Sequence, residues 1–380
     1  MKKHQKHANL KKPSIGNFGR NEFAIMGTPC GNIKSLAFAL IEQLKGRKTA
    51  YVDADHASAD QTPVPSDKAL AAGGNLSFTD KINFAQFNYL NQPNPYQKKF
   101  AFAEQDIVLV NGNHFAANRQ LLVLDSKKPL DKKIDKINNP VAIIRTDNEL
   151  DISQAIKEKF PDIDILPRFH INEIEKIAEF INSQSSIAPL KGLVLIGGQS
   201  QRMQENKALI KYHGRPQYEH TYQLLTALGL PTYLSVRSKQ ELDMPQIEDR
   251  FVGLGPFGAI CSAFQEDPDA AWLVLACDLP LLDTRAVEKL IEERDPSKLA
   301  TAFHNPATNF PDPLATIWEP KSYATMLSFL SIGYSCPRKV LINSDIKEIN
   351  PDNPQILLNA NTPEERDQIQ QRINGLLHQG

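Results

Sequence analysis

Short apolar runs alternate with amphipathic stretches along the chain, and this alternation limits the folds that the chain can adopt. In the first half the runs centre on Phe23, Tyr51, Val108 and Ala142, and each has the length and aliphatic character of a buried strand. Residues 35–46, between the first two runs, place apolar side chains at helical spacing. A strand, a helix and a second strand in this order predict a parallel sheet covered by helices.

The same alternation restarts beyond a polar stretch, SQSSIAPLK, which has the character of a linker. At 380 residues the chain exceeds one typical hydrophobic core. We therefore predict the α/β class, with two tandem three-layer α/β/α domains at residues 1–184 and 185–380. Between residues 57 and 97 the pattern weakens, and frequent proline and polar residues indicate a long loop or an insertion.

The composition excludes several classes of protein. The formal net charge is -1, from 43 basic and 44 acidic side chains, whereas a nucleic-acid-binding protein normally has a marked basic excess. The basic run MKKHQKHANLKKP is typical of a solvated tail; a contact with an anion or RNA is the alternative. No apolar stretch has the length of a membrane span. The four cysteines are scattered without a CxxC pair, which favours reduced thiols in the cytoplasm over a zinc site or disulfides.

A glycine-rich loop opens the second half. A predicted buried strand that ends at Ile196 leads directly into Gly197 and Gly198. Ligands bind at the carboxyl edge of open α/β sheets, and paired glycines let the main chain approach a base or a phosphate closely. Arg202 and Lys207 follow at a spacing that would let both neutralise a triphosphate. We predict a nucleotide-binding loop; a plain structural turn is the alternative.

The loop sequence LIGGQSQRMQENK resembles the signature L-x-G-G-x-S-x-R-M-G-x-D-K of the molybdenum cofactor guanylyltransferases, the MobA-like NTP transferases. Two positions depart from that signature. Gln204 stands where the family has glycine and would crowd the phosphates, and Asn206 replaces an aspartate that would orient Lys207. With these departures, the resemblance supports GTP binding better than it supports fast turnover.

Further segments resemble motifs of the same family in the same order. HGRPQYEH resembles G-x-P-L-x-x-H, IEDRFVGLGPFGAICSAF resembles E-D-x…G-P-L-x-G-I, WLVLACDLPLL resembles a strand ending in C-D-x-P, and NANTPEE resembles V-N-x-N-T-P-E-E. The resemblance covers residues 193–375. It implies a Rossmann-like nucleotidyltransferase domain in which Asp249 and Gly255 bind the nucleotide together with the strand end at Leu195 and Ile196. For Asp249, a carboxylate in a surface loop is the alternative.

A carboxylate, Asp278, ends the hydrophobic run LVLACD at the edge of the predicted sheet where ligands bind. Mg²⁺ prefers few carboxylates together with substrate phosphates and waters, so we predict that Asp278 binds Mg²⁺; capping of the next helix is the alternative. The resemblance implies transfer of GMP from GTP to the phosphate of molybdopterin, with release of pyrophosphate. It gives the catalytic positions to Arg202, Lys207 and Asp278.

The residues that would bind the acceptor, molybdopterin, are indicated only by weaker similarities to the family. NFPDPLATIW resembles a strand entry that begins with H-P in the family, but Asp312 occupies the histidine position. SCPRKVL resembles a basic element in which Arg338 would meet the acceptor phosphate; a solvated helix end is the alternative. Asn359 and Asn361 would order the loop near the acceptor.

The first half contains a predicted strand, glycine loop and helix, IMGTPCGNIKSLAFALIEQL. A working P-loop needs G-x-x-x-x-G-K-[ST]. Counted from Gly27, Lys34 and Ser35 stand one residue late, and Ile33 stands where the glycine before this Lys–Ser pair would be. We therefore predict a degenerate P-loop domain whose vestigial phosphate loop includes Gly27, Gly31, Lys34 and Ser35.

The surroundings of this loop resemble the P-loop adaptor of molybdopterin-guanine dinucleotide synthesis, the MobB-like family. In DIVLVNGNHF, Asn111 replaces the glutamate of that family's L-V-L-V-E-G strand. The resemblance implies weak or absent GTP hydrolysis, in a domain that serves as a scaffold or hands over substrate. Asp53, Asp55 and His56 form a remaining polar cluster at a strand end, either a metal or substrate site or a loop cap.

The leading hypothesis is a cytoplasmic guanylyltransferase of molybdenum cofactor maturation. Its substrates would be GTP and molybdopterin, and molybdoenzymes or cofactor-insertion proteins would be further partners. One alternative is a related transferase that uses CTP or a sugar or polyol phosphate. The other is a non-catalytic carrier of molybdopterin. We expect no nucleic-acid or membrane partner.

Overall fold

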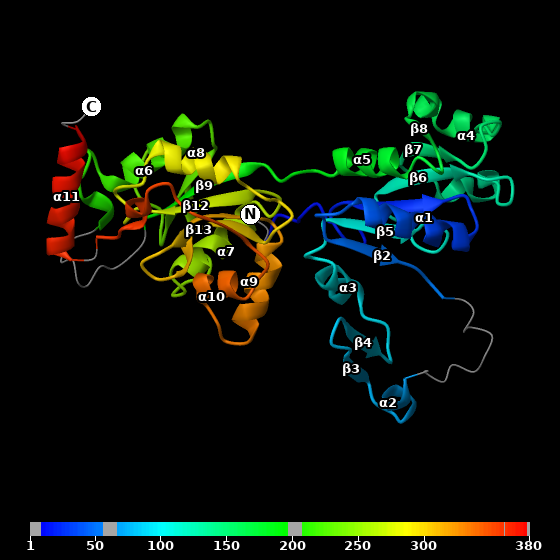
Figure 1. Cartoon of the computed structure of the whole chain (residues 1–380), viewed down its shortest axis with the longest axis horizontal. Coiled ribbons are helices and arrows are strands. Elements are labelled where there is room, and N and C mark those ends of the chain that lie inside the picture. The colour runs from blue at the N-terminus through cyan, green and yellow to red at the C-terminus, as the bar shows by residue number, and fades with distance from the viewer. Residues whose placement is uncertain (1–8, 56–66, 197–206, 361, 378–380) are drawn as a thin grey trace, which may run out of the picture. The chain divides into compact units, whose positions relative to one another are not determined.

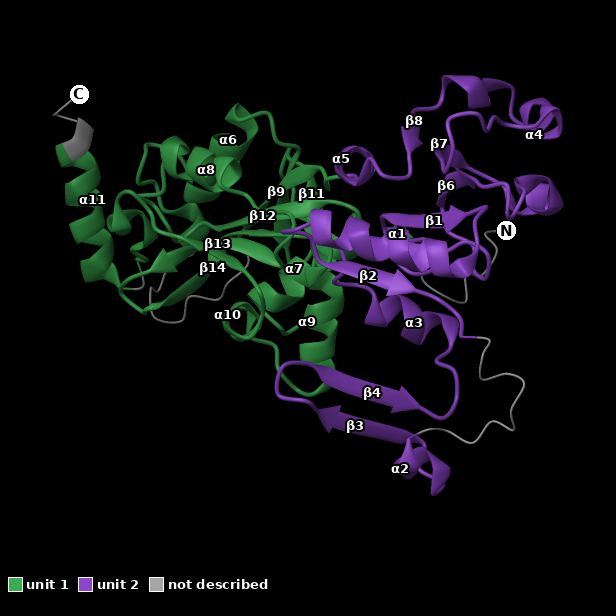
Figure 2. Cartoon of the chain, turned by 45° about the vertical axis from the view of Figure 1, so that its right-hand side comes forward, with its two compact units in different colours: residues 1–14, 187–380 green, residues 15–186 purple. Residues whose placement is uncertain are grey.

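The computed structural model describes residues 9–55, 67–196, 207–360 and 362–377 (Figure 1). It divides into two compact units (Figure 2). One unit comprises residues 15–186, and the other comprises residues 187–380 together with residues 1–14. The sequence analysis had placed residues 1–14 in the first domain and its end after residue 184. Within the described residues, no helix is both long and apolar enough to cross a membrane.

The unit of residues 15–186 is built on a six-stranded sheet with the order β2-β5-β1-β6-β7-β8. Every neighbouring pair in this sheet is parallel, as the strand–helix alternation predicts. The strands are β1 (Glu22–Met26), β2 (Thr49–Val52), β5 (Ile107–Asn111), β6 (Arg119–Leu124), β7 (Pro140–Arg145) and β8 (Arg168–His170).

Helices cover both faces of this sheet (Figure 1). Alternate residues of β6 point to opposite sides: Leu121 and Val123 pack against α1 and α5, whereas Leu122 and Leu124 pack against α4 and the 3-10 turns η1 and η2. The result is the predicted three-layer architecture. The helical elements are α1 (Cys30–Gln43), α4 (Gln154–Lys159), α5 (Ile174–Gln184), η1 (Leu130–Lys136) and η2 (Pro161–Ile165).

The insertion expected between residues 57 and 97 contains an antiparallel hairpin. Strands β3 (Leu76–Asp80) and β4 (Ala85–Tyr89) pair with Phe78 opposite Phe87, between the short helices α2 (Lys68–Ala71) and α3 (Pro95–Ala101). One face of the hairpin exposes large apolar side chains: Leu76, Phe78, Phe87 and Tyr89. Asp67 caps α2 and also accepts hydrogen bonds from Ser77 and Asn88, which fixes the other face.

The second unit contains a seven-stranded sheet with the order β11-β10-β9-β12-β14-β13-β15. Strand β14 is antiparallel to both its neighbours, and the remaining pairs are parallel. The strands are β9 (Leu190–Leu195), β10 (Thr232–Val236), β11 (Gln246–Glu248), β12 (Ala271–Ala276), β13 (Ala300–Asn305), β14 (Phe310–Trp318) and β15 (Lys347–Ile349).

The central strand β12 is fully buried and divides this unit's core into two clusters. Leu273 and Leu275 face the cluster that includes side chains of α6 and α8, and Trp272 and Val274 face the cluster formed with α7 and α9. The second unit is therefore also three-layered. Its helical elements are η3 (Lys207–Leu209), α6 (Gln217–Ala227), α7 (Pro256–Glu266), α8 (Thr284–Glu292), α9 (Ser322–Ser331), α10 (Pro337–Ile342), η4 (Pro354–Leu357) and α11 (Pro363–Leu377).

Residues 9–14 belong to the second unit because polar contacts attach them to the turn before β12. The Lys11 ammonium lies 2.6 Å from Asp267 Oδ1, and Lys191 binds the other oxygen of the same carboxylate, also at 2.6 Å. Ser14 donates to Asp269 through both its main-chain N–H and its hydroxyl. No local sequence pattern indicates these contacts, since the partners lie more than 250 positions apart.

Candidate active site

The carboxyl ends of β9 and β12 form the floor of the candidate site. The two strands are adjacent and parallel, with Leu195 paired to Ala276, so the segments that follow them start at the same edge of the sheet. Leu195 and Ile196 are buried there. Lys207 begins η3, and its Nζ lies 3.5 Å from Oδ2 of Asp278. The structure thus brings together two of the predicted catalytic residues.

Asp278 has one engaged and one unengaged carboxylate oxygen. Its Oδ1 atom is buried and has no hydrogen-bond partner, while Oδ2 faces Lys207. Burial raises the pKa of Asp278, and the neighbouring Lys207 ammonium opposes that rise. A buried carboxylate oxygen without a donor is unfavourable unless a cation or a ligand meets it.

This arrangement fits a hard divalent cation. A carboxylate oxygen is the ligand type that Mg²⁺ prefers, and the unpartnered Oδ1 offers a coordination position. Within the described residues no group of three or more His, Cys, Asp and Glu side chains could hold a metal ion. A cation at Asp278 would therefore need waters and substrate phosphates as further ligands, as Mg²⁺ sites in nucleotide enzymes commonly do.

Several predicted site residues lie outside the described residues. They are Gly197, Gly198, Arg202, Gln204, Asn206 and Asn361. Gly255 is described: it precedes α7 with a φ of 56°, a left-handed conformation that favours glycine. The nearby Gly258 allows a close approach, since a Cβ there would lie 2.3 Å from the Phe251 carbonyl oxygen.

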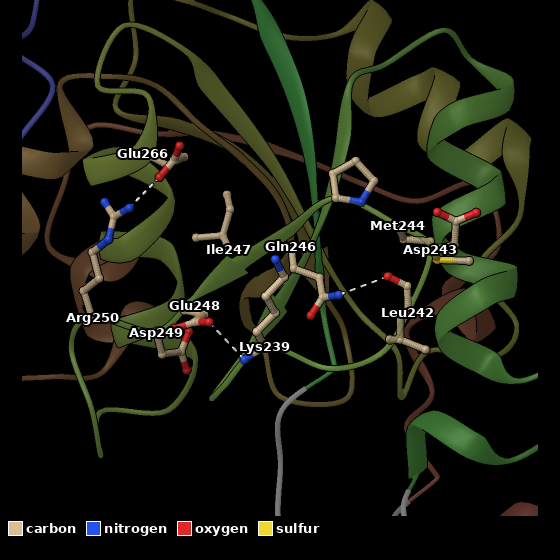
Figure 3. A pocket seen from close by; sticks show the side chains of 11 residues that line it. Lys239, Leu242, Asp243, Met244, Gln246, Ile247, Glu248, Asp249, Arg250 and Glu266 are labelled. Atoms are coloured by element: carbon tan, nitrogen blue, oxygen red, sulfur yellow. Dashed lines mark hydrogen bonds and ion pairs between the residues drawn. The ribbon is translucent and has the colours of Figure 1, made fainter.

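Asp249 lies at the other side of β10, directly after the edge strand β11. It accepts a hydrogen bond from Ser235 at 3.1 Å, and burial raises the pKa of its carboxyl. Figure 3 shows Asp249 among the side chains of a cavity of about 760 Å³ that runs along β11. The cavity is lined by polar groups that include Lys239, Glu248 and the Arg250–Glu266 ion pair, but not by Lys207 or Asp278.

The predicted acceptor residues lie on and after α10. Arg338 is in the first turn of α10, and its Nε is buried without a hydrogen-bond partner. A buried guanidinium nitrogen of this kind favours an anionic ligand. The adjacent Lys339 instead lies over the ring of Tyr334, with 4.7 Å between Nζ and the ring centroid. Asn359 is exposed after η4.

Two histidines support the loop after Asp278, and the sequence analysis had not singled them out. His213 donates from Nε2 to the carbonyl oxygen of Pro280 at 2.8 Å, and its ring stacks on His220 of α6 with centroids 3.8 Å apart. His213 thus contacts the loop after β12 through Pro280, two residues beyond Asp278, and His220 packs against His213. Both histidines lie in the segment HGRPQYEH, but the sequence does not indicate that His213 contacts Pro280.

We predict that His220 makes the folded protein less stable at mildly acidic pH. Burial, with the neighbouring His213, lowers the pKa of His220 from 6.5 to about 4. Between these pH values the unfolded chain binds a proton that the folded protein does not bind, so the free energy of unfolding falls as the pH falls. We expect the free energy of unfolding to fall by about 1 kcal/mol or less between pH 7 and pH 5, because the His220 ring is only partly buried.

Thermal unfolding of the wild type and of His220→Gln at several pH values would test this prediction. His304→Gln is the matched control, since His304 is paired with Glu348 on the surface. The wild type and the control should lose more stability between pH 7 and pH 5 than His220→Gln does. Parallel pH profiles for all three proteins would contradict the prediction.

In the unit of residues 15–186, the side chains of the degenerate P-loop, residues 27–35, contact neighbouring groups of the same unit. Gly27 has a φ of 101°, and a Cβ there would lie 2.2 Å from the Val123 carbonyl oxygen. The Lys34 ammonium extends over the ring of Phe38, and the Ser35 hydroxyl donates to the Gly31 carbonyl. Neither side chain is therefore directed as a P-loop lysine and serine are.

Carboxylates also face this loop. Thr28 donates to Asp125 at 2.5 Å, and Asn32 donates to the same oxygen at 3.3 Å. A carboxylate in this place disfavours an anionic phosphate. Asp53 is likewise engaged, because Tyr51 and Asn111 each donate to one of its oxygens at 2.8 and 2.7 Å. His56, which the sequence analysis grouped with Asp53 and Asp55, lies outside the described residues.

Comparison with known proteins assigns the C-terminal unit to a class. Residues 192–345 match the family of the MobA-like NTP transferase domain. These residues therefore form a nucleotidyltransferase domain of that family, which confirms the family predicted from the glycine loop and the later motifs.

Named relatives agree with this class. The chain is 37% identical over 189 residues to the molybdenum cofactor biosynthesis bifunctional protein of Synechocystis sp., covering 48% of this chain and 54% of the relative. It is 30% identical over 124 residues to a probable molybdenum cofactor guanylyltransferase of Flavobacterium johnsoniae, covering 32% of this chain and 65% of the relative. The matches thus span between 54% and 65% of these relatives' lengths.

Solved structures resemble each half separately. Molybdopterin-guanine dinucleotide biosynthesis protein A from Archaeoglobus fulgidus covers 49% of this chain and 99% of its own, with 18% identity and a TM-score of 0.42. Bacillus subtilis MobB covers 44% of this chain and 98% of its own, with 17% identity and a TM-score of 0.33.

Proposed function

We propose that this protein transfers GMP from GTP to the phosphate of molybdopterin, with release of pyrophosphate, in a reaction that requires Mg²⁺. The observation that carries the proposal is the Lys207–Asp278 pair at the carboxyl edge of β9 and β12, where Asp278 keeps a buried oxygen without a partner. The names of the relatives supply the choice of guanine nucleotide and acceptor.

The nucleotide would lie across the edge formed by β9, β10 and β12. Lys207 would act as a point charge on the triphosphate, a role that Arg202 would share. Main-chain groups at Leu195 and Ile196, with the glycines that follow, would meet the nucleoside. Asp249, which is half-buried directly after β11, would accept hydrogen bonds from guanine N–H groups or ribose hydroxyls.

The chemistry requires positioning and charge neutralisation rather than proton transfer. The attacking group is a phosphate that is already ionised at neutral pH, so no general base is needed. Asp278 would hold Mg²⁺, which supplies charge stabilisation at the phosphates of GTP. Lys207 would neutralise the charge that develops as pyrophosphate leaves. His213 would keep the Asp278 loop in place through its hydrogen bond to Pro280.

On the acceptor side, Arg338 would bind the phosphate of molybdopterin. Its buried Nε has no partner within the protein, and a guanidinium forms charge-assisted hydrogen bonds with phosphate oxygens. Asn359 and Asn361 would order the adjoining loop. The N-terminal unit would serve as a scaffold or hand over substrate, since its vestigial loop turns Lys34 and Ser35 away from a phosphate-binding geometry.

A nucleotide panel tests the proposal. The purified full chain is incubated with Mg²⁺, molybdopterin and GTP, CTP or ATP, and pyrophosphate release is followed. We expect release with GTP alone. Release with CTP would indicate cytidylyl transfer, and release only with a sugar or polyol phosphate would indicate another acceptor. Retained pterin binding without release from any nucleotide would replace the proposal with a carrier function.

A further inference from the structure

We propose that Asp312 supplies a second carboxylate to the metal site at Asp278. This inference rests on the proposed function, because it concerns the same cation. In the family motif the equivalent position is histidine, so the inference describes a feature of this chain. It follows from the pairing of two strands, from burial and from charge.

The register of β12 and β14 sets the two aspartates opposite one another. The strands are antiparallel, with Val274 opposite Thr316 and Leu275 opposite Ala315. Asp278 lies two residues beyond the end of β12, and this register, extended past the last pair, brings it level with Asp312 of β14. Residues directly opposite in an antiparallel pair have Cβ atoms about 5 Å apart and lie on the same face of the sheet.

Because both aspartates are largely buried, their proximity would lower the stability of the folded protein in the absence of a cation. Asp312 is only 6% exposed, and Oδ1 of Asp278 is buried without a partner. Lys207 contributes one positive charge against two carboxylates. Two like charges brought close together in a largely desolvated place destabilise the folded protein unless a further cation neutralises them. A divalent ion would remove that excess of negative charge.

Asp312 is held in a fixed orientation but keeps capacity to bind a cation. Its Oδ2 accepts from Asn305 at 3.0 Å, and its Oδ1 accepts from the main-chain N–H of Leu314 at 2.9 Å. A carboxylate offers about four lone-pair directions, so two remain. The two bonds remove most of the rotamer freedom that a metal ligand would otherwise lose on binding. Mg²⁺ sites that contact substrate phosphates commonly use one or two carboxylates.

Direct metal binding tests the inference without reliance on turnover. The affinity of the full chain for Mn²⁺, a paramagnetic substitute for Mg²⁺, is measured by electron paramagnetic resonance without nucleotide. We expect Asp312→Asn and Asp278→Asn each to weaken Mn²⁺ binding by about 10–100-fold. Asp283→Asn is the matched control, because Asp283 caps α8 and is expected to leave the affinity unchanged.

Asp312→Ser is a second variant that tests for a folding defect, since it removes the carboxylate but keeps one side-chain oxygen that can accept a hydrogen bond, where Asp312 accepts two. It should also lose Mn²⁺ affinity while unfolding at a temperature close to that of the wild type. Wild-type affinity in Asp312→Ser, with loss in Asp278→Asn, would overturn the role of Asp312 and leave the proposed function standing. Wild-type affinity in Asp278→Asn as well would overturn both the inference and the metal assignment of the proposed function.

Discussion

Replacing Asp278 by alanine is expected to lower nucleotidyl transfer by about 10³-fold. The substitution removes the buried oxygen that would hold the cation, together with the carboxylate oxygen that lies 3.5 Å from the Lys207 ammonium. Without the cation, the charge that develops on the leaving pyrophosphate is not neutralised, and this loss falls mainly on kcat. Pyrophosphate release under saturating GTP would measure the effect.

Asp283→Ala provides the control for this prediction. Asp283 lies five positions further along and accepts a hydrogen bond from the main-chain N–H of Ala286 at the start of α8. Its loss should lower the free energy of unfolding by about 1 kcal/mol and leave the rate close to that of the wild type. Equal rates for Asp278→Ala and the wild type would show that Asp278 does not hold the catalytic cation.

Replacing Glu319 by alanine is expected to destabilise the C-terminal unit by about 3–5 kcal/mol. Arg294 donates to both oxygens of Glu319, at 2.7 and 2.9 Å, and also to the carbonyl oxygen of Ala188. The side chain of Glu319 is 2% exposed and that of Arg294 is 11% exposed. Removal of the carboxylate would leave a buried guanidinium without its counter-charge, and urea unfolding would report the loss.

Two further variants separate the causes of this effect. Arg294→Met combined with Glu319→Leu removes both charges, and we expect it to cost far less than Glu319→Ala alone. Glu266→Ala breaks a similar ion pair with Arg250, but both side chains are more than 40% exposed. We therefore expect this variant to lower the free energy of unfolding by about 1 kcal/mol or less. A loss in Glu319→Ala no larger than that in Glu266→Ala would contradict the prediction.

The fold could be predicted where local pattern and tertiary position coincide. The apolar runs around Phe23, Val108 and Ala142 are buried parallel strands because such strands are covered on both faces. The hairpin β3–β4 was expected only as a loop or an insertion, although apolar and polar residues alternate in LSFTD and in AQFNY, a pattern typical of strands. The direction of β14 also lies beyond local pattern, because the sequence of a strand does not specify its partner.

The candidate site shows the same division. Lys207 and Asp278 could be expected to meet, because both follow neighbouring parallel strands. The contacts of His213 with Pro280 and the position of Asp312 opposite Asp278 depend on tertiary packing and on strand register, which no spacing in the sequence records. In the vestigial loop, the missing glycine was visible in the sequence, but the turn of Lys34 toward Phe38 was not.

The attachment of residues 9–14 has a consequence for any attempt to express the halves separately. A single cut near Ser186 yields a C-terminal fragment without Lys11 and Ser14, and among the described contacts Asp267 then retains Lys191 as its ion-pair partner. A tag or deletion at the N-terminus would therefore affect the stability of the C-terminal unit rather than that of the unit of residues 15–186. Co-expression of split fragments should therefore include a peptide carrying residues 1–14.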